Sequence, residues 1–278
     1  MIGFDLSPLH GISLSEHYRA GSVNFYLVLT SLTIMGDLTD SDSAPISVLR
    51  GHVLGSLTDA QAVVQREATE IDTEREAFDQ LAQQVTTIET VSDLRPEPQA
   101  HTLSVESQLQ AADQLREAYR ETVMNVPHYE DTYGESLETN VAAELPPEVA
   151  VLFQEPADQI TPDQKSRIRA AATNARASRE TLAANLADEQ ESLASAYDEL
   201  DAVITQLNGR HVPGWYTAQF EAILTNSIQT RQEILDDRPY RSQSDGHDLC
   251  HYLYADQGWT YPVLTAVARL RSAVECPE

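Results

Sequence analysis

Apolar residues recur every seven positions along one long segment in the second half of this chain, and this repeat strongly limits how the chain can fold. The clearest series is formed by four leucines: Leu186, Leu193, Leu200 and Leu207. The segment begins at Thr161-Pro162-Asp163-Gln164, which combines a helix-capping threonine, a first-turn proline and a capping-box glutamine. It ends at Asn208-Gly209, a typical helix C-terminus. The repeat predicts one helix of roughly 70 Å that packs lengthwise against a helical partner.

A second segment with the same seven-residue repeat lies earlier in the chain. Its apolar positions are Leu57, Val64, Ile71, Phe78 and Val85. Thr58-Asp59-Ala60-Gln61 has the pattern of a capping box, so we expect this helix to begin at Thr58. It should run to about Ser92, before Arg95-Pro96-Glu97-Pro98 interrupts it. The two long helices predict an antiparallel hairpin, and the alternative is a parallel homodimer through either repeat.

Between the two long helices lies an insertion. Residues 104–125 carry apolar side chains on one face and predict an amphipathic helix that Pro127 ends. From Pro127 to Asp158 there are eight acidic residues and no lysine or arginine. We therefore expect a solvated loop there, with short helices at about 135–145 and 147–154.

Three shorter helices should follow Gly209, near 213–236, 245–256 and 260–275. This region holds both tryptophans, Trp215 and Trp259, so we expect it to form a small helical head together with the insertion. The predicted fold class is all-α: a long antiparallel, coiled-coil-like helical hairpin with a smaller helical head. The predicted domains are a poorly defined N-terminal segment, 1–54, and the hairpin with its head, 55–278.

Charge sets the predicted environment of the protein. The chain has one lysine, 17 arginines and 44 acidic residues, for a formal net charge of −26. Such self-repulsion is tolerated where concentrated salt screens it, which indicates a halophilic protein. Duplex nucleic acid is not an expected partner, because phosphate binding needs clustered basic residues and weakens as salt rises. The two cysteines are too few for a disulfide framework, and a reduced cytoplasm is the expected location.

The N-terminal region contains an uncharged stretch from Gly21 to Gly36. Its apolar part is shorter than the roughly 20 residues that a membrane-spanning helix needs. Three interpretations stay open. The stretch is a buried or loosely packed segment, residues 23–36 contact a membrane, or the start codon is assigned too early and residues 1–50 are barely structured.

One helix face carries possible metal ligands. His247, Cys250 and His251 share a face and could bind zinc together with Cys276. Three ligands from a single helix are unusual, and packing of these side chains in the head is the better interpretation. A Cys250–Cys276 disulfide is a further alternative. We expect no metal and no cofactor.

The candidate functional residues surround a turn at Pro127. They are Arg116, Arg120, Glu121, His128, Tyr129 and Tyr133. A functional interpretation makes this turn a small polar pocket with His128 as acid or base. The interpretation that we favour is structural, with the aromatic rings docking the loop and Arg120 pairing with loop carboxylates.

Two sequence blocks resemble a known family. The first comprises Arg116–Met124, Val126–Glu130 and Tyr133–Glu135, and the second comprises Leu253-Tyr254 and Trp259–Leu264. They resemble an uncharacterised family of acidic helical proteins in haloarchaea, over about residues 55–275. The resemblance implies no activity, cofactor or residue role.

No phosphate-binding glycine loop, nucleophile elbow or zinc-protease motif occurs in the sequence. We therefore expect a non-enzymatic interaction or scaffold protein that binds a protein partner or a second copy of itself. One alternative is an enzyme or small-ligand protein with a site near His128, Tyr129 and Tyr133. Another is a membrane-proximal protein anchored by residues 23–36.

Overall fold

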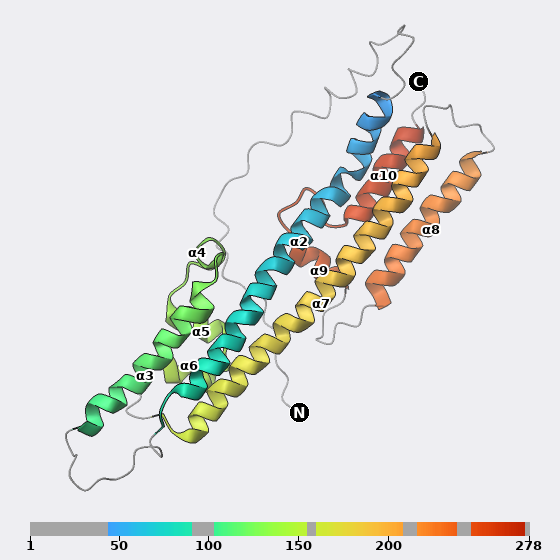
Figure 1. The fold of residues 1–278 in the computed structure, drawn as a ribbon. Coiled ribbons are helices and arrows are strands. Elements are labelled where there is room, and N and C mark those ends of the chain that lie inside the picture. Colours follow the sequence, from blue (N-terminus) through green and yellow to red (C-terminus); the bar gives the residue numbers. More distant parts are fainter. Residues whose placement is uncertain (1–43, 91–102, 155–159, 208–215, 238–245, 276–278) are drawn as a thin grey trace. The chain divides into compact units, whose positions relative to one another are not determined.

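The computed structural model describes residues 44–90, 103–154, 160–207, 216–237 and 246–275. Within these ranges all regular secondary structure is helical and no strand occurs (Figure 1). The helices are α2 (Ala44–Thr87), α3 (Leu103–Thr122), the 3-10 helix η2 (Val123–Asn125), α4 (Tyr129–Thr132), α5 (Leu137–Glu144), α6 (Pro147–Gln154), α7 (Pro162–Leu207), α8 (Tyr216–Asp237), α9 (Gly246–Tyr254) and α10 (Pro262–Glu275). The all-α fold class is confirmed.

Helix α7 begins and ends as the sequence predicts. The Gln164 amide nitrogen donates to Thr161 Oγ1 at 3.2 Å, and the Thr161 amide donates to Gln164 Oε1 at 2.8 Å. This reciprocal pair is the expected capping box. The helix ends at Leu207, directly before Asn208-Gly209.

Helix α2 begins earlier than predicted, at Ala44 rather than Thr58. Thr58 lies inside the helix, and its hydroxyl donates to the Leu54 carbonyl oxygen at 3.3 Å instead of capping a helix N-terminus. Val53 and Leu54 are buried one turn before Thr58. Because a helical backbone continues through these apolar residues, their burial outweighs the local capping signal.

The chain forms two compact units. We call residues 62–191 the insertion unit and residues 1–61 with 192–278 the terminal unit. Helices α2 and α7 contribute to both units.

In each unit α2 and α7 pair in antiparallel directions (Figure 1). In the terminal unit Arg50 of α2 forms an ion pair with Asp201 of α7 and donates to Thr205 Oγ1 at 2.9 Å. In the insertion unit Lys165, near the start of α7, donates to the carbonyl oxygens of Thr86 and Ile88 at the end of α2, at 2.8 and 2.6 Å. Residue numbers thus rise along α2 as they fall along α7, which confirms the predicted antiparallel hairpin.

The insertion unit packs α3, α5 and α6 on the α2–α7 pair through one apolar core. The segment from Pro127 to Asp158 contains the two predicted short helices, α5 and α6, but its described part is not solvated and contributes to that core. Its buried residues include Leu137, Val141, Leu145, Val149 and Phe153. Leu137 and Val141 are one turn apart on α5, and Val149 and Phe153 are one turn apart on α6, so each short helix has an apolar face toward the core. The high acidic charge of the segment led to the expectation of solvation, although its helices bury their apolar faces.

The terminal unit packs α8 against α9 and α10. Cys250 and Tyr254 of α9 are fully buried, and the Tyr254 ring lies 5.2 Å from that of Trp259. The insertion and the C-terminal helices were predicted to build one head, but they belong to different units. Each set has its own apolar face and packs on a different stretch of the long helices.

Within the described ranges, no helix combines the length and the apolar character needed to cross a membrane. Residues 1–43 lie outside these ranges. The expectations for residues 23–36 and for most of the segment 1–54 therefore concern a part of the chain that the structure does not describe.

Candidate functional site

A cluster of polar side chains lies inside the insertion unit, and two of the sequence-predicted site residues belong to it. Arg179 Nε lies 3.0 Å from Glu74 Oε2, and Arg179 Nη2 lies 2.7 Å from Glu144 Oε2. The other oxygen of Glu74, Oε1, accepts a hydrogen bond from the Tyr133 hydroxyl at 2.7 Å and lies 3.0 Å from His128 Nε2. We call Glu74, His128, Tyr133, Glu144 and Arg179 the buried cluster.

Four elements supply these side chains. Glu74 comes from α2, one turn from the buried Ile71 and Phe78, so it faces the core. Arg179 comes from α7 and occupies a position of the leucine heptad, seven residues before Leu186. Glu144 ends α5, and His128 and Tyr133 flank the short helix α4.

The turn around α4 is built by local hydrogen bonds. The Tyr133 and Gly134 amides both donate to the Tyr129 carbonyl oxygen, at 2.8 and 3.0 Å. Gly134 has φ +55°, and a Cβ atom there would lie 3.2 Å from the Glu130 carbonyl oxygen. Glycine therefore allows the chain to reverse after α4 while Tyr133 points at Glu74.

Aromatic side chains surround the buried cluster. The Arg179 guanidinium carbon lies 4.9 Å from the centre of the Phe78 ring, a cation–π distance. Tyr129 is buried and donates to the Glu135 carbonyl oxygen at 3.2 Å. Tyr119 donates to Asn140 Oδ1 at 2.8 Å and packs edge-on against Phe153. The expected docking of the turn by its aromatic residues agrees with this geometry.

The buried cluster is shielded from solvent and carries an unbalanced charge. The side chains of Glu74 and Glu144 are each 7% exposed, that of His128 is 12% exposed and that of Arg179 is 15% exposed. Two carboxylates and one guanidinium give a formal charge of −1 when the imidazole is neutral. In a medium of low dielectric constant this surplus is costly unless a proton or hydrogen bonds offset it.

The two carboxylates respond to burial in opposite ways. Burial alone would raise the pKa of Glu74, but the Arg179 charge and the hydrogen bonds from Tyr133, His128 and Arg179 lower it overall. For Glu144, burial prevails over the attraction of Arg179, and the pKa of that carboxyl is raised. Burial and then the Glu74 charge raise the pKa of Tyr133, and burial with the nearby Glu135 raises the pKa of Tyr129 to about 12. Both phenols are therefore hydrogen-bond donors at neutral pH.

The remaining predicted site residues lie outside the buried cluster. Arg116 Nε donates to the Phe153 carbonyl oxygen at 2.8 Å, near the end of α6. Arg120 was expected to pair with loop carboxylates, but its ion pair at 3.5 Å is with Glu117 of its own helix. Glu121 is exposed. Of the six predicted residues, His128 and Tyr133 belong to the buried cluster, and the Tyr129 ring lies 5.6 Å from that of Tyr133.

The cavity beside the buried cluster is too small for a ligand. It is lined by residues that include Glu74, Phe78, Tyr133 and Arg179, and its volume is about 10 Å³. This is about the space that one water molecule needs.

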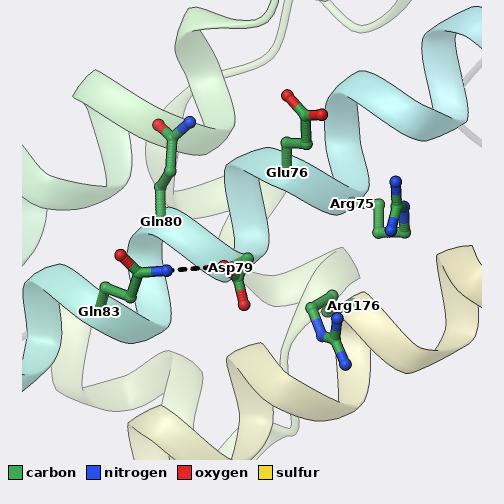
Figure 2. A pocket seen from close by; sticks show the side chains of 6 residues that line it. All are labelled: Arg75, Glu76, Asp79, Gln80, Gln83 and Arg176. Carbon is green, nitrogen blue, oxygen red and sulfur yellow. Dashed lines mark hydrogen bonds between the residues drawn. The ribbon is translucent and has the colours of Figure 1, made fainter.

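A larger groove lies on the surface of the same unit, between α2 and α7 (Figure 2). Its volume is about 360 Å³, and its lining residues are Arg75, Glu76, Asp79, Gln80, Gln83 and Arg176. Gln83 donates to Asp79 Oδ2 at 2.7 Å. Arg75 lies 3.2 Å from Asp72, and Arg176 lies 3.6 Å from Glu180. All of these lining residues are polar or charged, and they include charges of both signs.

In the described part of the chain, no group of three or more histidine, cysteine, aspartate or glutamate residues is arranged to hold a metal ion. On α9, Cys250 Sγ lies 3.6 Å from Arg231 Nη2, and His251 is exposed with its ring 6.0 Å from that of Tyr261. The side chain of His247 and all of Cys276 lie outside the described part. The proposed zinc and disulfide alternatives therefore concern residues of which only some are described.

These features define an all-α protein built on a helical hairpin, with a charged cluster enclosed where the insertion packs on the hairpin. The chain belongs to the family described as a domain of unknown function, DUF7260, whose profile matches residues 55–277. No curated protein and no solved structure matches the chain.

Proposed function

We propose that this protein is a non-enzymatic helical scaffold that binds a protein partner in a halophilic cytoplasm. The observation that carries this proposal is the enclosure of the His128 turn. Its polar groups contact one another in the interior, and the adjoining cavity of about 10 Å³ leaves no room for a substrate. The role of the buried cluster in this proposal is structural. Its side chains connect α2, α5, α7 and the turn around α4.

The groove between α2 and α7 is the surface that we propose for the partner. Large apolar side chains on the described surface are few and scattered: Val48, Val151 and Tyr252. A partner that docked mainly through apolar contacts would need a contiguous patch. Arg75 and Arg176 instead offer guanidinium groups to the same groove as Glu76 and Asp79. A partner with both acidic and basic side chains complements this surface.

The test begins with affinity capture from a lysate kept at molar salt, followed by identification of the captured protein and reconstitution with the purified partner. The double variant Arg75→Glu, Arg176→Glu should weaken binding of that partner at least about tenfold, since charge reversal places like charges together. The matched control is Arg167→Glu, an exposed residue of α7 outside the groove. Light scattering of the purified protein distinguishes a second copy from a different partner.

Two results would contradict this proposal. Equal binding by the groove variant and the Arg167→Glu control would exclude the groove. A folded His128→Gln variant that lost turnover of a small molecule shown by the wild type would make the protein an enzyme.

A further inference from the structure

Two arginines of the groove between α2 and α7 have unused hydrogen-bond donors. Arg75 lies 3.2 Å from Asp72 and Arg176 lies 3.6 Å from Glu180, and the side chains of the two carboxylates are 60% and 61% exposed. Exposed ion pairs of this kind contribute little to stability. Within the described residues no other hydrogen bond or ion pair engages either guanidinium, so most of their N–H donors are available to a ligand.

The two guanidinium groups reach the groove from different helices at nearly the same height. Arg75 follows Glu74 on α2, and Arg176 precedes Arg179 by one turn on α7, so the Glu74–Arg179 ion pair fixes their register. Because the helices are antiparallel, Arg176 lies about two residues, or roughly 3 Å, from Arg75 along the helix axis. Figure 2 shows both arginines toward one end of the groove and Gln83 toward the other.

The net charge of the groove lining does not repel a carboxylate. The lining combines the two arginines with Glu76 and Asp79, which gives a formal charge of zero, whereas the whole chain carries −26. Asp79 accepts a hydrogen bond from Gln83 at 2.7 Å, so its carboxylate has a partner other than the arginines. The groove is therefore a place on this acidic protein where an additional carboxylate can be accommodated.

We propose that Arg75 and Arg176 together bind one carboxylate of the partner, an aspartate or glutamate side chain that anchors the partner in the groove. This inference rests on the proposed function of the same groove. A planar guanidinium can donate two parallel hydrogen bonds to a carboxylate, and such charge-assisted bonds are short and strong. They act at contact distance, so molar salt, with a Debye length of roughly 3 Å, weakens them less than it weakens longer-range attraction.

Acetate is the probe for this site in the isolated chain. Chloride in a molar potassium chloride solution is replaced stepwise by acetate at constant ionic strength, and the arginine Nε–Hε resonances are followed by NMR. The resonances of Arg75 and Arg176 should shift and saturate, because acetate binds between the two side chains. Arg167, an exposed residue of α7 that pairs with Asp163, is the matched control and should shift little and without saturation. In the variant Arg75→Lys the response of Arg176 should fall to that of Arg167, because an ammonium group cannot replace the planar guanidinium.

The purified partner from the lysate experiment tests the same contact in the complex. The double variant Arg75→Lys, Arg176→Lys keeps both charges but loses both planar groups, and it should weaken partner binding at least about tenfold.

This variant also distinguishes the failure of this inference from the failure of the proposed function. If the lysine variant binds like the wild type while Arg75→Glu, Arg176→Glu does not, the groove binds its partner by charge alone. The carboxylate site is then wrong although the proposed function stands. If neither variant weakens binding, the groove itself is excluded. Equal acetate responses of Arg176 and Arg167 in the wild type would also overturn the carboxylate site.

Discussion

The terminal unit and the insertion unit use the same two long helices but join other elements to them differently. In the terminal unit α10 attaches to α2 through individual contacts. Ser56 Oγ donates to the Pro262 carbonyl oxygen, and Arg269 donates to the His52 carbonyl oxygen, each at 3.1 Å. In the insertion unit Glu74 and Arg179 together connect α2, α7, α5 and the α4 turn.

This difference shows what each kind of contact contributes. Apolar burial stabilises packing without fixing a unique arrangement, whereas a buried ion pair is costly in any arrangement that leaves one partner alone. We infer that the buried cluster selects one docking position for the turn of the insertion. The terminal unit has a buried charged side chain of its own, Arg231, which donates to Ser192 Oγ at 2.7 Å.

The largest effect should come from lowering the salt. Residues 62–191 contain 26 acidic and 10 basic side chains, a net −16, whereas the rest of the chain has 18 acidic and 8 basic side chains, a net −10. As salt falls from molar to roughly 0.1 M, self-repulsion should therefore unfold the insertion unit first. Far-UV circular dichroism should lose helix before the fluorescence of Trp215 and Trp259, both in the terminal unit, changes. Undiminished helicity at low salt would contradict the halophilic interpretation.

Removing the central cation should strongly destabilise the insertion unit. Arg179→Met leaves two carboxylates buried without a cation, which should lower the free energy of unfolding by about 3–5 kcal/mol. The control Arg167→Met breaks an exposed pair with Asp163 and should cost less than about 1 kcal/mol. Urea unfolding followed by circular dichroism at molar salt compares the two variants. Similar costs for both would mean that the buried cluster contributes little.

Substitution of a buried apolar residue tests what stabilises the terminal unit. Leu193 is fully buried, and Leu193→Ala should cost about 2–5 kcal/mol through lost burial and a cavity. Val48 is 50% exposed in the same unit, so Val48→Ala should change stability by less than about 0.5 kcal/mol. Tryptophan fluorescence during urea unfolding monitors both. If Leu193→Ala proved no worse than its control, the heptad would not form the core of this unit.

Replacing the single lysine, Lys165, should have a smaller effect on stability. Lys165 Nζ donates to two carbonyl oxygens at the C-terminal end of α2, where a cation also interacts favourably with the helix dipole. Lys165→Met should cost about 1 kcal/mol. Arg169→Met, at an exposed position one turn further along α7, serves as the control and should be nearly neutral. Equal thermal unfolding of the two variants would show that the lysine does not stabilise the end of α2.

Features determined by neighbours in sequence were predictable, because periodicity and capping are local signals. The heptad repeats predicted two long helices that pair in antiparallel directions. Thr161-Pro162 predicted the start of α7. The start of α2 was missed because its extension depends on tertiary burial of Val53 and Leu54.

The buried cluster could not be assembled from local signals, because its members come from four elements widely separated in the chain. One indication was available: Glu74 interrupts an apolar stripe of α2, and Arg179 occupies a leucine-heptad position of α7. A charge at an interface position predicts a buried partner of opposite sign. It does not predict that Glu144, His128 and Tyr133 will complete the set.

The central claim is that the turn of the insertion is held on α2 through the buried cluster, and a double-mutant cycle between His128 and Glu74 tests it most directly. The cycle uses His128→Ala, Glu74→Gln and the double variant, with unfolding free energies measured at one pH and one molar salt concentration. We predict a coupling energy of about 1–3 kcal/mol, because the two side chains interact inside the protein at 3.0 Å. Additive effects within about 0.3 kcal/mol would show that the two residues do not interact, and would contradict this account of the turn.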